Sequence, residues 1–216
     1  MNDVVALIDL IGQNFIFCLK MVALLIAVHV LNISSGGALA VLGIIPRRWY
    51  GLLGILFSPF IHGSFTHLLF NSLPLIILVN VLLLTGELQF FIISSQIALM
   101  GGFLIWLLGR DAIHIGASGL ILGYMGYVMV YGYLDPSMMT TLILLVLLYY
   151  IGGILIGLMP SDEGVSWEGH VFGFVAGIVS GLFSFYPEYY PQAVSIVLDT
   201  PGIWLYQWLQ SYALLS

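Results

Sequence analysis

The sequence contains very few charged residues. Ten acidic residues and four Lys or Arg residues make up 6% of the 216-residue chain, whereas charged side chains account for about 25% of an ordinary soluble domain. Hydrophobic residues make up 61%, and the mean hydropathy is +1.13. These residues offer too little polar surface for a soluble domain, so the sequence predicts an integral membrane protein surrounded by the lipid bilayer.

Two further scarcities exclude classes of function. The four basic residues form no run that could follow a phosphate backbone, so nucleic acid is not an expected partner. The single cysteine, Cys18, excludes an intrachain disulfide and a thiolate metal cluster, and no metal or cofactor is expected. Asp3 and Asp9 stand where a signal peptide would be basic, which predicts that the N-terminus is retained.

Long apolar windows occupy most of the chain. Each approaches the length of about 20 residues that a helix needs to cross a bilayer, and none shows the alternation of a barrel strand. The sequence therefore predicts an all-α membrane protein with six transmembrane helices in one domain, residues 1–190. The six windows cover approximately residues 15–33, 67–86, 89–108, 117–134, 139–159 and 169–186.

The segments outside the windows carry interfacial residues. The first connection, about residues 34–66, contains two arginines beside Trp49 and Tyr50, and this combination favours the membrane interface. We expect the connection to lie partly in the membrane without crossing it. Residues 191–216 are interrupted by Pro201 and Gly202, and they form either an interfacial tail or a seventh helix.

Three arginines lie in two of the connections. Arg47 and Arg48 belong to the first connection and Arg110 to the third, and with six spans these two connections share one side of the membrane. The positive-inside rule would place that side in the cytoplasm.

One serine stands at the start of a membrane window. Ser118 lies in Gly116-Ala117-Ser118-Gly119, where the fourth window begins. The free N–H groups and positive dipole end of a helix N-terminus would stabilise an oxyanion on a carbonyl attacked there, which makes Ser118 a candidate nucleophile. The alternative is a serine used for close packing in a glycine-rich helix.

One histidine begins the sixth window. His170 follows Gly169, and an imidazole can take the proton of a serine hydroxyl and return it to a leaving group. No carboxylate occupies a matching intramembrane position, so the predicted pair is a dyad, and Glu168 is interpreted as a solvated acid at the helix start. The alternative for His170 is a hydrogen-bonded packing residue.

Glycine spacing supports a close pairing of the fourth and sixth windows. Gly173 and Gly177 share the face of the sixth window that carries His170, and Gly119 and Gly123 are spaced i, i+4 on the fourth. Small residues at this spacing let two membrane helices approach closely. Such an approach is what a Ser–His hydrogen bond requires.

A second histidine begins the second window. His67 and Asn71 are spaced i, i+4, so their side chains share a helix face and can donate hydrogen bonds toward one point. That arrangement suits an oxyanion hole. The alternative is a His–Asn pair that ties down the first connection.

Taken in chain order, these motifs resemble the rhomboid intramembrane serine proteases. The segment from His62 to Asn71 is similar to the family's H-x-x-x-N signature on the second helix, and residues 116–119 are similar to its G-x-S-G. Residues 170–177 are similar to its H-x-x-G-x-x-x-G. The match extends over about residues 40–185.

The resemblance implies roles for individual residues. Ser118 would be the nucleophile, His170 the general base and acid, and His67, Asn71 and the Ser118 backbone N–H the oxyanion donors. Four residues after the nucleophile the family often has Tyr or Phe, and this sequence has Leu122. That departure predicts a less firmly oriented His170.

The resemblance also implies a function. It predicts a serine endopeptidase that cuts transmembrane segments of other membrane proteins, through an acyl-enzyme, in a bacterial-type cell membrane. It places the first and third connections away from the cytoplasm, against the arginine count. The alternative function is a non-catalytic rhomboid-like protein that binds transmembrane helices. A transporter or channel is disfavoured because none of the six windows carries a central carboxylate.

Overall fold

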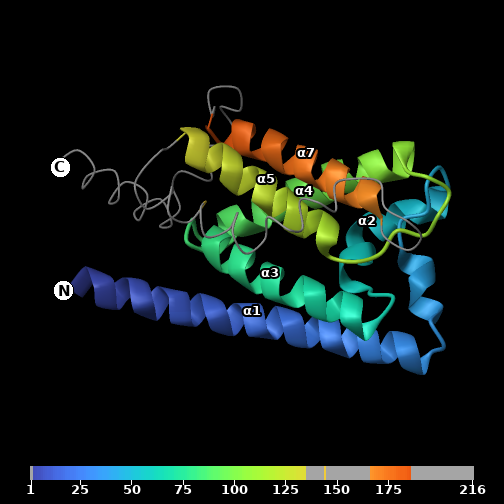
Figure 1. Cartoon of the computed structure of the whole chain (residues 1–216), viewed down its shortest axis with the longest axis horizontal. Helices are drawn as coiled ribbons and strands as arrows, with labels where there is room; N and C mark the ends of the chain where they lie inside the picture. Colours follow the sequence, from blue (N-terminus) through green and yellow to red (C-terminus); the bar gives the residue numbers. More distant parts are fainter. Residues whose placement is uncertain (1, 135–143, 145–165, 186–216) are drawn as a thin grey trace.

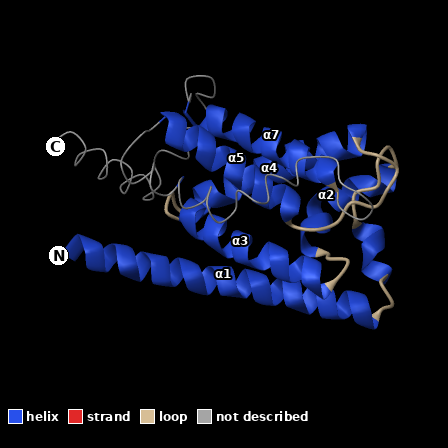
Figure 2. Cartoon of the chain, in the orientation of Figure 1, coloured by secondary structure: helices blue, strands red, loops and turns tan. Residues whose placement is uncertain are grey.

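The computed structural model describes residues 2–134, 144 and 166–185. Within these residues every regular element is a helix (Figure 2). The long helices are α1 (Asn2–Ser34), α3 (Phe65–Leu83), α4 (Glu87–Leu108), α5 (Ser118–Leu134) and α7 (Trp167–Phe185). They coincide with the first, second, third, fourth and sixth apolar windows, and the fifth window and the 191–216 tail lie outside the described residues.

The lengths of the described helices suit a bilayer. Three of them are long and apolar enough to cross it, namely the Asp9–Ser34 part of α1, α3 and α4. Helix α5 has 17 residues, which gives about 25 Å at 1.5 Å per residue. The predicted helical membrane bundle is thus confirmed. Helix α1 begins earlier than its apolar window, and the residues before that window include no proline that would end the helix.

The helices form two connected groups (Figure 1). Helix α1 lies along one edge and packs mainly on α3, while α4, α5 and α7 pack against one another on the other side of α3. The most extensive contact in the described structure joins α5 and α7. Completely buried apolar side chains from several helices fill the centre, including Leu78, Val79, Ile93, Leu122 and Met125.

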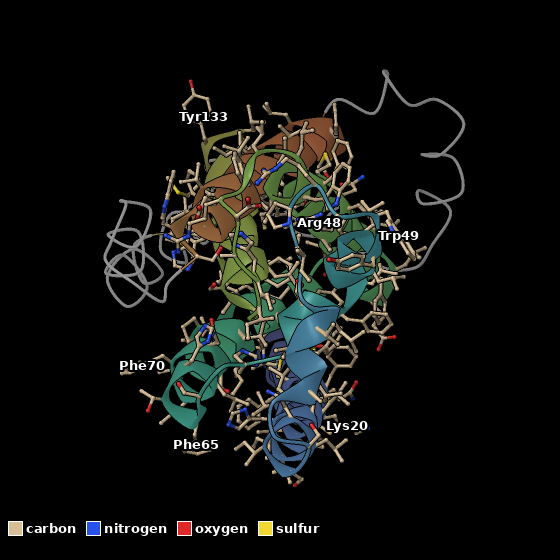
Figure 3. The ribbon with its side chains drawn as sticks, turned by 90° about the vertical axis from the view of Figure 1, so that its right-hand side faces the viewer. Lys20, Arg48, Trp49, Phe65, Phe70 and Tyr133 are labelled. Atoms are coloured by element: carbon tan, nitrogen blue, oxygen red, sulfur yellow. The ribbon has the colours of Figure 1, made fainter. Side chains whose placement is uncertain are left out.

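Large apolar side chains cover the outside of the bundle. Phe70 and Tyr133 are 75% and 82% exposed, and they project away from the helices together with Phe65 and Trp49 (Figure 3). A water-soluble protein rarely exposes so many large apolar side chains. A surrounding hydrocarbon phase explains it, which agrees with the integral membrane assignment.

The first connection folds into short helical turns that return to its own beginning. These are η1 (Ala38–Leu42), η2 (Trp49–Leu53), α2 (Gly54–Phe57) and η3 (Ser58–Phe60). A Cβ atom on Gly51 would overlap the backbone of Ile45, and one on Gly54 would overlap the backbone of Gly43. Two glycines therefore allow the backbone contact that holds Ser58 beside the third connection.

The first and third connections are joined at one end of the bundle. Ile44 and His114 exchange two backbone hydrogen bonds of 2.9 Å. Arg47 Nη2 lies 2.8 Å from Asp111 Oδ1, and Arg47 Nη1 donates to the Gly109 carbonyl at 2.7 Å. The prediction that these two connections share one side is confirmed.

Candidate active site

Ser118 is the first residue of α5. Gly116 reaches a φ of +115°, which side chains other than that of glycine rarely adopt, and its N–H donates to the Ser58 carbonyl at 2.9 Å. The Ala117 carbonyl accepts the Ile121 N–H at 3.0 Å, so the helical hydrogen bonds begin there. The N–H groups of the first turn, including that of Ser118, have no carbonyl one turn earlier to accept them.

The imidazole of His67 lies against the loop that carries Ser118. A Cβ atom on Gly116 would stand 2.6 Å from His67 Cε1 and 2.9 Å from its Nε2, so only a glycine leaves room for the ring. The Ser64 hydroxyl caps α3 and accepts the His67 N–H at 3.1 Å. The ring of His62, which is fully buried, packs edge-on against His67 at a centroid distance of 5.1 Å.

Asn71 lies one turn further along α3. Its side chain is buried, and Nδ2 donates to the His67 carbonyl at 2.8 Å. A carboxamide has two N–H bonds, so one remains to face a ligand. Asn71 therefore lies beside His67, but half of its donor capacity serves the helix backbone.

His170 lies in the first turn of α7. Its side chain is buried. A Cβ atom on Gly119 would stand 3.2 Å from the Gly169 carbonyl oxygen. Because Gly119 follows Ser118 and Gly169 precedes His170, the two chain segments that carry the candidate dyad are in contact.

Further glycines continue this contact along the two helices. A Cβ atom on Gly173 would overlap the Gly119 carbonyl oxygen, and one on Gly177 would overlap the Gly123 carbonyl oxygen. We call this the glycine seam, formed by Gly119 and Gly123 of α5 with Gly173 and Gly177 of α7. The backbones touch here because no side chain separates them.

A small cavity opens beside Ser118. It has a volume of about 50 Å³, and it lies between α4, α5, α7 and the first connection. Gly116, Gly119, His114 and Ser166 are among the residues that line it. One water molecule needs roughly 10–15 Å³ of such space, so the cavity has room for water next to the candidate nucleophile.

One charged residue near the site differs from the sequence interpretation. Glu168 is 3% exposed, its Oε1 lies 3.4 Å from Arg110 Nε, and it accepts the Arg110 backbone N–H at 3.4 Å. The interpretation of Glu168 as a solvated acid was therefore wrong. The first turn of α7 packs against the third connection, which covers Glu168. Helical periodicity cannot predict that a loop distant in sequence will cover a residue.

The sequence interpretation also missed a pair of polar residues. His114 Nδ1 lies 2.6 Å from Ser166 Oγ, and each of the two residues stands four positions before a member of the candidate dyad. This equal spacing before Ser118 and before His170 was the one feature of the sequence that could have indicated the pair. Among the described residues, no three His, Cys, Asp or Glu side chains gather closely enough to hold a metal ion.

The fold and the site together define a class: a polytopic helical membrane protein with a serine and two histidines gathered where its helices begin. The family model of the Rhomboid domain matches residues 46–187. This chain therefore belongs to the rhomboid family.

Mycobacterial proteins are similar to this chain. An uncharacterized protein of Mycobacterium tuberculosis is 39% identical over 167 residues, which cover 73% of this chain and 70% of the relative, and an uncharacterized protein of Mycobacterium bovis has the same values. An uncharacterized protein of Mycobacterium leprae is 34% identical over 134 residues, which cover 58% of this chain and 53% of its own length.

Proposed function

We propose that this protein is an intramembrane serine endopeptidase that cleaves transmembrane segments of other membrane proteins. The observation that carries the proposal is the placement of Ser118. It begins a helix, the His67 ring lies against its loop, and the first turn of α7 touches the next residue along α5. Membership of the rhomboid family, most members of which are serine proteases, supports the same conclusion.

The proposed reaction has two stages. Ser118 Oγ attacks the substrate carbonyl while its proton moves to His170, and the C–N bond then breaks as His170 returns that proton to the leaving amine. In the second stage a water molecule attacks the acyl-enzyme, its proton passes to His170, and the Ser118 oxygen leaves with that proton. Each stage passes through an oxyanion.

Three donors would stabilise that oxyanion. They are the Ser118 backbone N–H, the His67 ring and the second N–H of Asn71. Donors held in place before the reaction act most strongly in a site with little water. The Ser64 hydroxyl fixes the backbone of His67, and the His67 ring packs against Gly116. These contacts are present without substrate, so they hold the ring in place before the reaction.

The substrate must present an accessible carbonyl near water. A helical peptide hides its carbonyls in hydrogen bonds, so we expect a helix-weakening Gly or Pro near the cleaved bond. Glycines line the surroundings of Ser118, which favours a small residue such as Ala before that bond. The cavity beside Ser118 offers room for the water that the second stage consumes.

We also propose a bacterial cell membrane as the location, with the first and third connections facing away from the cytoplasm. Similarity to mycobacterial proteins supports the membrane. The arginine count argues for the opposite orientation, but Arg47 pairs with Asp111 and Arg110 with Glu168. Two of the three arginines are therefore neutralised by acids of the same protein, which weakens that count.

Labelling with a fluorophosphonate tests the proposed nucleophile. A hydroxyl activated by a base beside oxyanion donors reacts with electrophiles that ordinary serines ignore, so mass spectrometry should place the adduct on Ser118. The purified protein should also cleave a transmembrane reporter, and Ser118→Ala should not. A protein that binds the reporter without cleaving it, and takes no label at Ser118, would instead be a non-catalytic helix-binding protein.

Asn71→Ala should lower kcat by about 10²–10³-fold, the usual effect of removing one oxyanion donor while others remain. The measurement is steady-state cleavage of the reporter. Asn80→Ala is the matched control, because Asn80 lies on the same helix and its Nδ2 donates to the Ile11 carbonyl of α1, away from the site. If both variants have the wild-type kcat, Asn71 serves only the His67 carbonyl.

A further inference from the structure

Two side chains connect the segment before Ser118 with the segment before His170. His114 belongs to the third connection and Ser166 directly precedes α7, and the 2.6 Å distance between Nδ1 and Oγ joins them. His114 is 3% exposed. His114 lies four residues before Ser118, and Ser166 lies four residues before His170. The bond between them therefore links the two proposed dyad members through two short segments of chain.

The neighbours of the pair define where its hydrogen atoms lie. His114 Nε2 is 3.2 Å from the Arg110 carbonyl, which can only accept, so Nε2 carries the proton. Nδ1 must then accept the hydroxyl hydrogen of Ser166. The Gly169 N–H donates to the same hydroxyl oxygen at 3.2 Å. Burial lowers the pKa of His114, which favours this neutral form.

The pair is attached firmly at both ends. On one side, the His114 backbone exchanges two hydrogen bonds with Ile44. On the other side, Ser166 caps the first turn of α7 through the Gly169 N–H, and its carbonyl accepts the His170 N–H at 3.3 Å. A shift of Ser166 would therefore be passed directly to the backbone of His170.

The glycine seam constrains α7 by a different kind of contact. Contact between glycine backbones sets how closely the two helices approach. A hydrogen bond has a preferred length and angle. The His114–Ser166 bond can thus fix the height and rotation of the first turn of α7, in addition to the constraint that the seam provides.

We propose that the His114–Ser166 hydrogen bond positions His170 relative to Ser118 and so sets the rate of the chemical step. His114 and Ser166 are positioning residues, and neither reacts with the substrate. The role rests on the proposed protease function. The proposal means that His114 and Ser166 affect the reaction rate, although they do not belong to the group formed by Ser118, His170, His67 and Asn71.

The test compares variants that remove or retain the hydroxyl. Ser166→Ala should lower kcat by about 10–100-fold with KM nearly unchanged, because a misplacement of about 1 Å can cost on the order of 10²-fold. Ser166→Thr keeps the hydroxyl and should retain most activity. His114→Asn should also retain part of it, since its amide oxygen can accept from Ser166, whereas His114→Phe should not.

A double variant separates positioning from general damage. Two residues that act through one shared bond lose it only once, so His114→Phe with Ser166→Ala should be no worse than the poorer single variant. Ser94→Ala is the matched control. It removes another hydrogen bond between helices, the 2.9 Å contact of Ser94 with the Tyr124 hydroxyl on α5, and should leave kcat unchanged.

The outcomes distinguish the two proposals. If the wild-type protein cleaves the reporter and Ser166→Ala has the same kcat, the positioning role is overturned and the protease function is not. Equal losses of kcat in Ser166→Ala and Ser166→Thr have the same meaning. Additive losses in the double variant overturn it too. Failure of the wild-type protein to cleave any transmembrane reporter overturns the protease function itself. If His114→Phe does not fold, as judged by its Tm, the comparison of Ser166→Ala with Ser166→Thr alone decides the question.

Discussion

If the proposed protease function holds, replacing His170 with alanine is expected to reduce reporter cleavage by on the order of 10⁶-fold, as removal of the catalytic histidine does in subtilisin. Without this imidazole the Ser118 hydroxyl keeps its proton, and no group returns a proton to the leaving amine. Single-turnover cleavage in detergent measures the loss, and the helical fold should persist because the α5–α7 contact does not depend on this side chain.

Two comparisons make the His170 prediction specific. Ser118→Ala combined with His170→Ala should be no less active than either single variant, since residues of one catalytic unit are not additive. Fluorophosphonate labelling of Ser118 should disappear in His170→Ala. Cleavage that survives in His170→Ala at a rate close to wild type would mean that another group activates the serine, such as His67, whose ring lies against the loop that carries Ser118.

Replacing Gly173 with alanine is expected to lower kcat by on the order of 10²-fold, through distance and not through chemistry. Even the single Cβ of alanine would overlap the Gly119 carbonyl oxygen, so α7 must move away from α5. A displacement of about 1 Å of a catalytic group can cause a loss of this size. Gly177→Ala, which overlaps the Gly123 carbonyl, should act in the same way, and leucine at either position should abolish activity.

A glycine in open space provides the control for these variants. No atom lies within 4 Å of a Cβ placed on Gly12 of α1, so Gly12→Ala should keep its activity and have a Tm no lower than that of the wild type. The two seam variants should also have a lower Tm, because overpacking costs about 1–3 kcal/mol. Wild-type cleavage by both Gly173→Ala and Gly177→Ala would show that the rate does not depend on close approach at the seam.

Much of the fold could be predicted because the bilayer imposes a simple rule. A chain in hydrocarbon must satisfy its backbone internally, so a long apolar window predicts a helix. In the described part of the chain, α3, α4, α5 and α7 follow their windows within a few residues. The glycine spacing was informative for a related reason. In a membrane helix, small residues mark the face where another backbone approaches.

Other features could not be read from periodicity. Glu168 lies at a helix start where an acid is usually solvated, but the third connection covers it and supplies Arg110. The spacing of His67 and Asn71 indicated two donors aimed at one point, and the structure uses one N–H of Asn71 for the His67 carbonyl. Both outcomes depend on which groups come near in space.

The sequence by itself determined that the protein is a helical membrane protein and which residues are candidates for chemistry, because hydropathy and glycine spacing act locally along the chain. Only the tertiary structure decided how the connections meet. The return of the first connection onto Gly43, its pairing with His114, and the bond from His114 to Ser166 join residues far apart in sequence. Such contacts are set by loop geometry, and no periodic pattern encodes them.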